Sequence, residues 1–241
     1  MIHPLTELRA FVTAALLQPV SEPSIESART MARRRWVSGA TLVLGAGTLG
    51  WAVRIEPGDS LFYPATMALA TVWTIGALVS GPLQLGYAHT RAGGRRSRSV
   101  VQSLVLGLLL LAVFLGGAAI VARVPALREP VLGLLDHARY GSLPLVALIT
   151  AINGVAEELY FRGALFASAP RRHAVALTTL VYALATVPTA IPLLVFAAAS
   201  LGLLVGLQRR VTGGVLGPIV THLTWSLGML FLLPSALELW R

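Results

Sequence analysis

The chain has 241 residues, of which 56% are hydrophobic and 12% are charged, and its formal net charge is +9 at pH 7. A soluble domain is about a quarter charged, so this composition excludes an ordinary soluble protein and indicates that the solvent is a lipid bilayer. Cysteine is absent, which excludes disulfides, thiol catalysis and zinc sites built from cysteine.

Residues 1–36 are predicted to form an amphipathic N-terminal segment on the cytoplasmic side. Apolar residues recur at steps of three and four from Leu5 to Leu16, which is the spacing of one helix face, and Pro19 and Pro23 follow that face. Two interpretations stay open: the helix lies on the membrane surface, or it docks against the protein's own bundle.

Seven apolar segments follow, and most are near the length of about 20 residues that crosses a hydrocarbon core. They are residues 37–53, 61–80, 100–122, 143–168, 174–187, 190–207 and 214–233. We therefore expect an all-α polytopic helical bundle with about seven spans. It divides into N-terminal transmembrane helices (37–142), core helices (143–233) and a C-terminal tail (234–241). The fifth segment has only 14 residues beside Pro188 and Pro192, so an alternative is that the fifth and sixth form a hairpin that does not fully cross.

The arginines predict the orientation of the chain. All 19 basic residues are arginine and cluster between apolar segments, which is a membrane-topology pattern, so we expect no nucleic-acid partner. With the N-terminus inside, thirteen arginines fall on the cytoplasmic side and five outside. Because arginine-rich loops stay in the cytoplasm, we predict a multi-pass protein of the cell inner (plasma) membrane with a cytoplasmic N-terminus and an external C-terminus.

Two carboxylates and an arginine interrupt the apolar segment 143–168. Each ionised group at mid-bilayer costs about 2.5–3.5 kcal/mol on insertion scales, so Glu157, Glu158 and Arg162 require compensation. Glu158 and Arg162 stand at i, i+4 and can pair along one helix face. Glu157 is rotated by about 100° from Glu158, so its carboxylate needs another helix, a metal or water. Repulsion between the adjacent carboxylates suits one of them to general-base chemistry, whereas a purely structural role is the alternative.

The last apolar segment carries a second candidate site at His222 and Ser226. These residues are one helical turn apart and point the same way, and the histidine can bind metal, relay a proton or donate to an oxyanion. At 1.5 Å per residue, Glu157 lies about 9 Å and His222 about 12 Å from the inner edge of a core about 30 Å thick. The two residues are therefore expected at one level, near the cytoplasmic side.

The pattern Glu157-Glu158-x-x-x-Arg162, followed by a span and Pro218-x-x-x-His222, resembles the CPBP intramembrane metalloprotease family. That family groups type II CAAX prenyl endopeptidases with bacterial relatives linked to bacteriocin processing and self-immunity. The resemblance covers roughly residues 143–230. It implies that Glu157 activates water, that Glu158 and Arg162 support it, and that His222 is a metal or oxyanion ligand.

Two residues depart from the family pattern. Thr186 stands where the second motif has histidine, with Tyr182 at that motif's phenylalanine, and Ser226 replaces the asparagine of the third motif. A catalytic zinc needs three protein ligands, and of the expected set only His222 and the glutamates are in register. Binding of Zn²⁺ at Glu157 and His222 therefore stays open.

The leading hypothesis is an intramembrane endopeptidase that cleaves a membrane-associated protein or peptide. In it Glu157 polarises water, while His222 and Ser226 stabilise the oxyanion. One alternative is a catalytically inactive relative that acts as a membrane binding, immunity or scaffold protein. Another is a small transporter that uses the glutamates as a proton site, although no inverted repeat is visible. The sequence names neither the substrate nor the oligomeric state.

Overall fold

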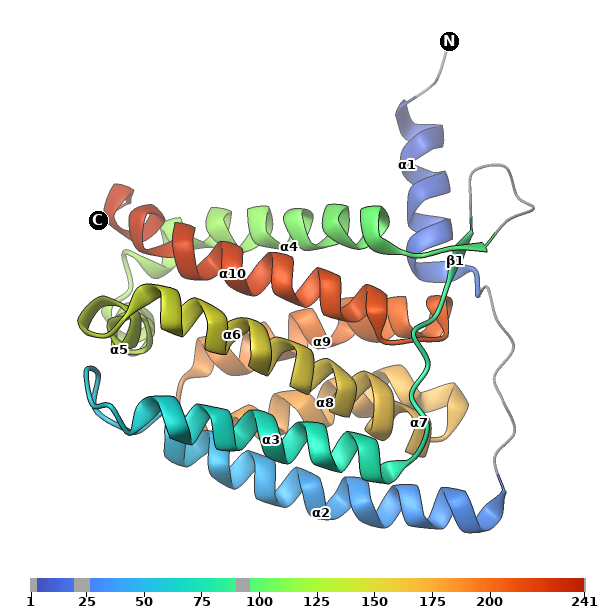
Figure 1. Ribbon diagram of the computed structural model, residues 1–241. Coiled ribbons are helices and arrows are strands. Elements are labelled where there is room, and N and C mark those ends of the chain that lie inside the picture. Colours follow the sequence, from blue (N-terminus) through green and yellow to red (C-terminus); the bar gives the residue numbers. More distant parts are fainter. Residues whose placement is uncertain (1–3, 20–26, 90–95, 241) are drawn as a thin grey trace.

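The computed structural model describes residues 4–19, 27–89 and 96–240, and helices dominate these residues (Figure 1). The bundle consists of α2 (Ala28–Ala52), α3 (Phe62–Ser80), α4 (Val100–Val121), α6 (Leu143–Glu158), α8 (Ala174–Thr186), α9 (Pro192–Thr212) and α10 (Leu216–Leu239). Two antiparallel strands of two residues each, β1 (Ala88–His89) and β2 (Arg96–Ser97), precede α4. The prediction of an all-α polytopic bundle is confirmed, and every predicted apolar segment is helical.

Five helical segments of the described chain are long and apolar enough to cross a membrane. They are Phe62–Ser80, Val100–Val121, Leu143–Ser168, Pro192–Thr212 and Leu216–Leu239. The remaining two predicted spans, in α2 and α8, do not meet that description. The 13 residues of α8 extend about 20 Å at 1.5 Å per residue, short of a core about 30 Å thick. α8 and α9 form a helical hairpin through the turn Val187–Thr189, which agrees with the hairpin alternative for α8.

The start of α2 and the end of α10 lie at opposite ends of the bundle (Figure 1). The arginines that begin α2, precede α8 and end α9 all lie at the end where α7 (Phe166–Ser168) is found. The chain therefore enters the bundle at the arginine-rich end and leaves it at the other end, as an odd number of passes requires (Figure 1). That the arginine-rich end faces the cytoplasm stays a prediction.

The predicted N-terminal helix is present as α1 (Pro4–Val12), which a π-helical turn, Thr13–Leu17, continues. α1 projects from the bundle and exposes Leu5 and Leu8 (Figure 1). The π turn instead packs against α9, where Ala15 is buried and Arg210 donates to the Leu16 carbonyl at 3.3 Å. The docking interpretation therefore holds for the second half of the segment. Pro23 lies outside the described residues.

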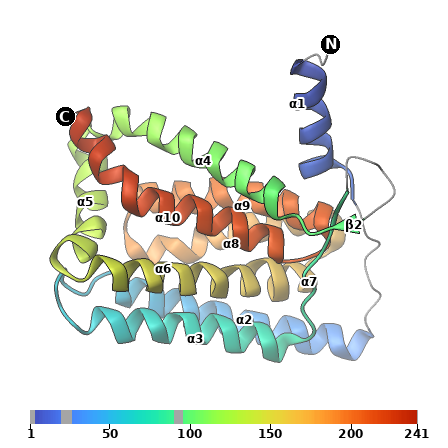
Figure 2. The same cartoon turned by 45° about the horizontal axis from the view of Figure 1, so that its top comes forward.

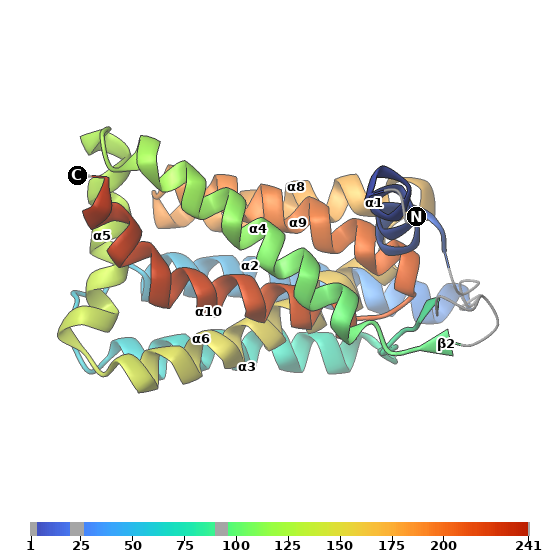
Figure 3. The same ribbon diagram turned by 90° about the horizontal axis from the view of Figure 1, so that it is seen from above.

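Sequence reasoning did not anticipate α5 (Pro125–Tyr140), which runs across the bundle at the end opposite the arginine clusters (Figures 2 and 3). Its His137 stacks on Phe62 of α3, with ring centroids 4.0 Å apart. The last helix is also longer than predicted. α10 continues through Pro234 to Leu239, into the residues that were predicted to form a tail. The two elements close that end of the bundle.

The main core surrounds the helix that begins with α6. Trp73 of α3 stacks on Tyr160 at 4.6 Å and is tilted against Phe161 at 5.1 Å. Gly45 of α2 admits the indole, since a Cβ there would lie 2.1 Å from the Trp73 ring. The buried Tyr160 hydroxyl donates to the Ser38 carbonyl at 2.6 Å. These contacts hold the continuation of α6 against α2 and α3, while α6 itself also packs against α10.

Candidate active site

The helix that carries the glutamates changes its winding directly after Glu158. α6 ends there, the chain continues as a π-helical stretch, Leu159–Leu165 (η2), and α7 follows without a break. Residues 160–165 are buried. Such π-helical stretches occur frequently at functional sites. Arg162 therefore extends from a widened turn at the centre of the protein, close to the glutamates.

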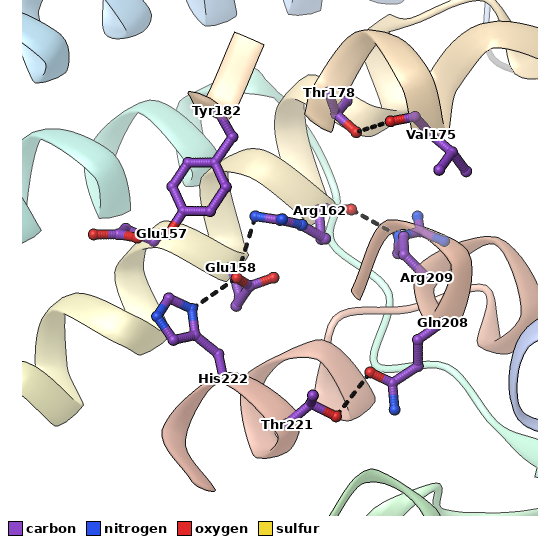
Figure 4. Close-up of polar contacts among 10 residues, drawn as sticks. All are labelled: Glu157, Glu158, Arg162, Val175, Thr178, Tyr182, Gln208, Arg209, Thr221 and His222. Carbon is purple, nitrogen blue, oxygen red and sulfur yellow. Dashed lines mark hydrogen bonds and ion pairs between the residues drawn. The ribbon is translucent and has the colours of Figure 1, made fainter. Parts of the chain in front are cut away.

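Glu158, Arg162 and His222 form what we call the charged cluster. The Glu158 Oε1 atom accepts a hydrogen bond from Arg162 Nη1 at 3.2 Å and lies 2.8 Å from His222 Nδ1 (Figure 4). All three side chains are buried. The predicted i, i+4 pair is present, and the expected level of His222 agrees with its place beside Glu158. One carboxylate oxygen thus joins α6, η2 and α10.

Glu157 has a different partner, on α8. Tyr182 and Glu157 lie next to each other (Figure 4), and the Tyr182 hydroxyl donates to Glu157 Oε2 at 2.5 Å. The Glu157 side chain is only partly buried. From the sequence, the Glu157 carboxylate was expected to need a partner on another helix, a metal or water. In the structure that partner is Tyr182 on α8. The Arg162 guanidinium also lies over the Tyr182 ring, with its central carbon 4.7 Å from the ring centroid. Sequence reasoning assigned Tyr182 no role, although a hydroxyl at a phenylalanine position was the signal that could have revealed one.

Two glycines permit the close approach of the helices at the site. A Cβ at Gly202 of α9 would lie 3.4 Å from Arg162 Nη2 and 3.3 Å from Tyr182 Cδ1. A Cβ at Gly154 of α6 would lie 3.0 Å from Leu223 of α10 and 3.8 Å from His222 Nε2. Larger residues at either position would push α9 or α10 away from the carboxylates.

Ser226 and Thr186 are not joined to the charged cluster. The Ser226 Oγ atom is buried and has no hydrogen-bond partner among the described residues. The Thr186 hydroxyl donates to the Ala183 carbonyl of its own helix at 2.8 Å. Thr186 nevertheless follows Tyr182 by one turn on α8, so the two residues share a helix face.

The charged cluster keeps unused hydrogen-bonding capacity. Within the part of the chain that the structure describes, Glu158 Oε2 and the Nε and Nη2 atoms of Arg162 are buried without a partner. Most buried polar atoms in proteins are paired, so such exceptions mark sites where chemistry or binding takes place. The arrangement offers an acceptor and two donors in the interior of the helical bundle.

The residues present do not fit a catalytic zinc. Among the described residues, no three His, Cys, Asp or Glu side chains form a group that could hold a metal ion. Glu158 Oε1 is already shared by Arg162 and His222, and His222 uses Nδ1 for that contact. His222 Nε2, Glu157 and the unpartnered Glu158 Oε2 are the remaining donors, but they do not form the group of three protein ligands that a catalytic zinc takes.

Comparison with known proteins covers this same part of the chain. Residues 139–228 match a family model described as Type II CAAX prenyl endopeptidase Rce1-like. The matched stretch begins at the end of α5 and ends within α10, so it contains the glutamates, Arg162, Tyr182 and His222. Comparison with curated proteins and with solved structures found no match.

Proposed function

We propose, on the premise that residues 139–228 of the chain belong to the Rce1-like family of type II CAAX prenyl endopeptidases, that Glu157 is the general base of an intramembrane endopeptidase. The family supports peptide-bond hydrolysis within a membrane. The observation that carries the assignment to Glu157 is the unequal environment of the two glutamates. Glu158 is buried between Arg162 and His222, whereas Glu157 is partly exposed and held by one tyrosine hydroxyl.

Glu157 has the freedom that a general base needs. Its Oε2 atom is oriented by Tyr182, which leaves the other carboxylate oxygen to accept a proton from water. As that water attacks the peptide carbonyl, Glu157 takes the proton and the carbonyl oxygen gains the negative charge. The protonated Glu157 then delivers the proton to the departing amine nitrogen as the carbon–nitrogen bond breaks.

His222 is placed to stabilise the oxyanion. As an imidazolium, it donates Nδ1–H to Glu158 and presents Nε2–H on the opposite side of its ring. The Glu158 oxygen that lies beside His222 Nδ1 also pairs with Arg162, so one carboxylate orients both side chains. Ser226 adds a buried hydroxyl one turn along α10, with no competing partner among the described residues.

The substrate is proposed to be a membrane-associated protein or peptide. His222 is the seventh residue of α10 and Glu157 is near the end of α6, so the site lies nearer to the arginine-rich end of the bundle (Figure 1). We predict that this end is cytoplasmic and that the membrane is the inner (plasma) membrane. Substrates therefore enter laterally from the bilayer or from the cytoplasm.

A cleavage assay with purified protein in liposomes tests the proposal. The probes are two quenched fluorescent peptides, one with a prenylated C-terminus and one with a transmembrane segment. We expect Glu157→Gln to lower kcat by at least about 100-fold, the usual contribution of a general base, without lowering the unfolding temperature. Glu129→Gln, on the exposed surface of α5, is the matched control and should cleave as wild type does. An unchanged rate for Glu157→Gln would refute the assignment.

The inactive relative is kept as the second candidate because of one observation. At the position of the second-motif histidine, the Thr186 hydroxyl contacts its own helix rather than the glutamates. In that case both probes would stay intact with wild-type protein, while binding to a membrane peptide would survive Glu157→Gln.

A further inference from the structure

Two adjacent residues of α9, Gln208 and Arg209, reach the two halves of the glutamate site in different directions (Figure 4). One half is η2 with Arg162, and the other is the turn of α10 with His222. We propose that Gln208 and Arg209 are positioning residues that hold these two halves in register. The proposal rests on the proposed function, because it assigns these residues a role in the same reaction.

Gln208 contacts the α10 half through what we call the neutral cluster, made of Ser103, Gln208 and Thr221. Gln208 Nε2 donates to Ser103 Oγ of α4 at 2.7 Å. The Thr221 hydroxyl lies 3.0 Å from Gln208 Oε1 and 3.1 Å from the Ser103 carbonyl. All three side chains are completely buried. Because Thr221 directly precedes His222, this cluster fixes the rotation and height of the helical turn that carries the imidazole.

Close packing leaves that turn little room to move. A Cβ at Gly217 would lie 3.0 Å from Gln208 Nε2, so α10 can approach the amide only through a glycine. A Cβ at Gly107 of α4 would lie 2.8 Å from the Thr221 carbonyl. Gly217 therefore lets α10 approach the Gln208 side chain, and Gly107 lets α4 approach the backbone of α10 at Thr221.

Arg209 contacts the η2 half. Its Nε atom donates to the Arg162 carbonyl at 2.7 Å, and its guanidinium lies over the Phe166 ring at 5.1 Å from the centroid. The contact is with the backbone of Arg162, within the π-helical stretch. Arg209 therefore fixes the main chain from which the Arg162 guanidinium reaches Glu158.

Since Gln208 and Arg209 are neighbours on one helix, α9 links the main-chain positions of Arg162 and His222. These are the two residues that meet at Glu158 Oε1, at 3.2 and 2.8 Å. Misplacement by about 1 Å can lower an enzyme's rate by about 100-fold, so the link has a direct kinetic consequence.

The first test uses two substitutions at Thr221 that differ in one hydroxyl. Thr221→Val keeps the shape and removes the hydroxyl, whereas Thr221→Ser keeps it. The readout is the imidazole ¹⁵N resonances of His222 at fixed pH in detergent-solubilised protein, assigned with His222→Gln. The change in these ¹⁵N chemical shifts between wild type and Glu158→Gln gives the full effect of losing the carboxylate contact. We expect Thr221→Val to show at least about half of that difference and Thr221→Ser to keep the wild-type signal.

The second test uses Arg209. Arg209→Met keeps an unbranched chain in place of the aliphatic stem but removes the guanidinium donors, whereas Arg209→Lys keeps a donor nitrogen and the positive charge. We expect Arg209→Met to lower kcat about tenfold at an unchanged KM, with recovery in Arg209→Lys. Arg210→Met, at an exposed arginine of the same helix, is the control and should match wild type.

Failure of this proposal is distinguishable from failure of the proposed function. If wild type cleaves neither probe, the proposed function fails, while the His222 resonances still test the positioning. Wild-type resonances in Thr221→Val would overturn the role of Gln208, even if that variant melts at a lower temperature. Equal kcat in Arg209→Met and wild type would overturn the role of Arg209.

Discussion

The charged and neutral clusters meet on α10, where His222 belongs to one and the preceding residue, Thr221, belongs to the other. In the neutral cluster, Gln208 uses both ends of its amide, and its partners are likewise hydrogen-bonded. In the charged cluster, Glu158 and Arg162 keep buried atoms without a partner among the described residues. A satisfied buried network rigidifies a core, whereas unused polar capacity in a core is costly and marks a place for chemistry. The difference assigns positioning to one cluster and reactivity to the other.

The largest expected effect on stability comes from breaking the charged cluster. Arg162→Ala removes the arginine from the buried ion pair with Glu158 and should cost about 3 kcal/mol or more, as breaking other buried ion pairs does. Adding Glu158→Gln should restore part of the loss, because the carboxylate that lost its arginine is then replaced by a neutral amide. Chemical unfolding of the detergent-solubilised protein measures both variants.

Arg172→Ala provides the control for that experiment, since Arg172 is an exposed arginine in the 3-10 turn Arg171–His173 that precedes α8. It should unfold as wild type does. If Arg162→Ala also unfolds like wild type, the ion pair contributes nothing, and the contrast between the two clusters fails.

A second substitution sharpens the contrast by adding a ligand near the carboxylates. Thr186 lies one turn beyond Tyr182 on the same face of α8, so Thr186→His should place an imidazole towards Glu157. We expect affinity for zinc or cobalt to rise at least tenfold, which is about 1.4 kcal/mol. Adding Ser226→Asn should raise the affinity further if the two positions share one site.

Equilibrium metal titration of wild type and both variants measures this effect, with the cleavage assay as its companion. Tight metal binding and cleavage by the wild type would show that Thr186 is not the position of a missing ligand. No gain in either variant would favour a site that binds a partner without cleaving it.

Tyr182→Phe should have a smaller effect on stability, about 1 kcal/mol, because it removes one hydrogen bond to a carboxylate that is only partly buried. Its effect on the reaction should be larger than its effect on unfolding, since the orientation of Glu157 depends on that hydroxyl. The cleavage assay and chemical unfolding are compared on the same preparation. A loss of stability without a loss of kcat would make Tyr182 a packing residue only.

The fold was largely predictable because apolar segments of about 20 residues have few alternatives to a helix in a bilayer. The amphipathic α5 escaped prediction because its apolar residues are too few for a membrane segment. The π-helical stretch Leu159–Leu165 also escaped, since no spacing of residue types distinguishes it from an α-helix. In both cases tertiary packing, rather than a local pattern, determines the outcome.

The candidate site was predictable in its members but not in its pairings. The i, i+4 spacing indicated the contact of Glu158 with Arg162, and membrane depth indicated that His222 would be near the glutamates. The sequence could not show that His222 meets Glu158 rather than Glu157. Adjacent residues point about 100° apart, and the rotation of α6 depends on close contacts such as that at Gly154.

The smallest expected effect on stability belongs to Ser226→Ala. A buried hydroxyl without a partner contributes no hydrogen bond to the resting protein and carries a desolvation cost, so its removal should not lower the free energy of unfolding and should raise it slightly. If the same hydroxyl donates to the oxyanion during the reaction, kcat should nevertheless fall by about tenfold or more. Thr224→Val is the matched control, because the Thr224 hydroxyl donates to the Val220 carbonyl of its own helix at 2.7 Å. Its loss should leave kcat unchanged. A wild-type kcat in Ser226→Ala would remove Ser226 from the site and leave His222 as the oxyanion donor on α10.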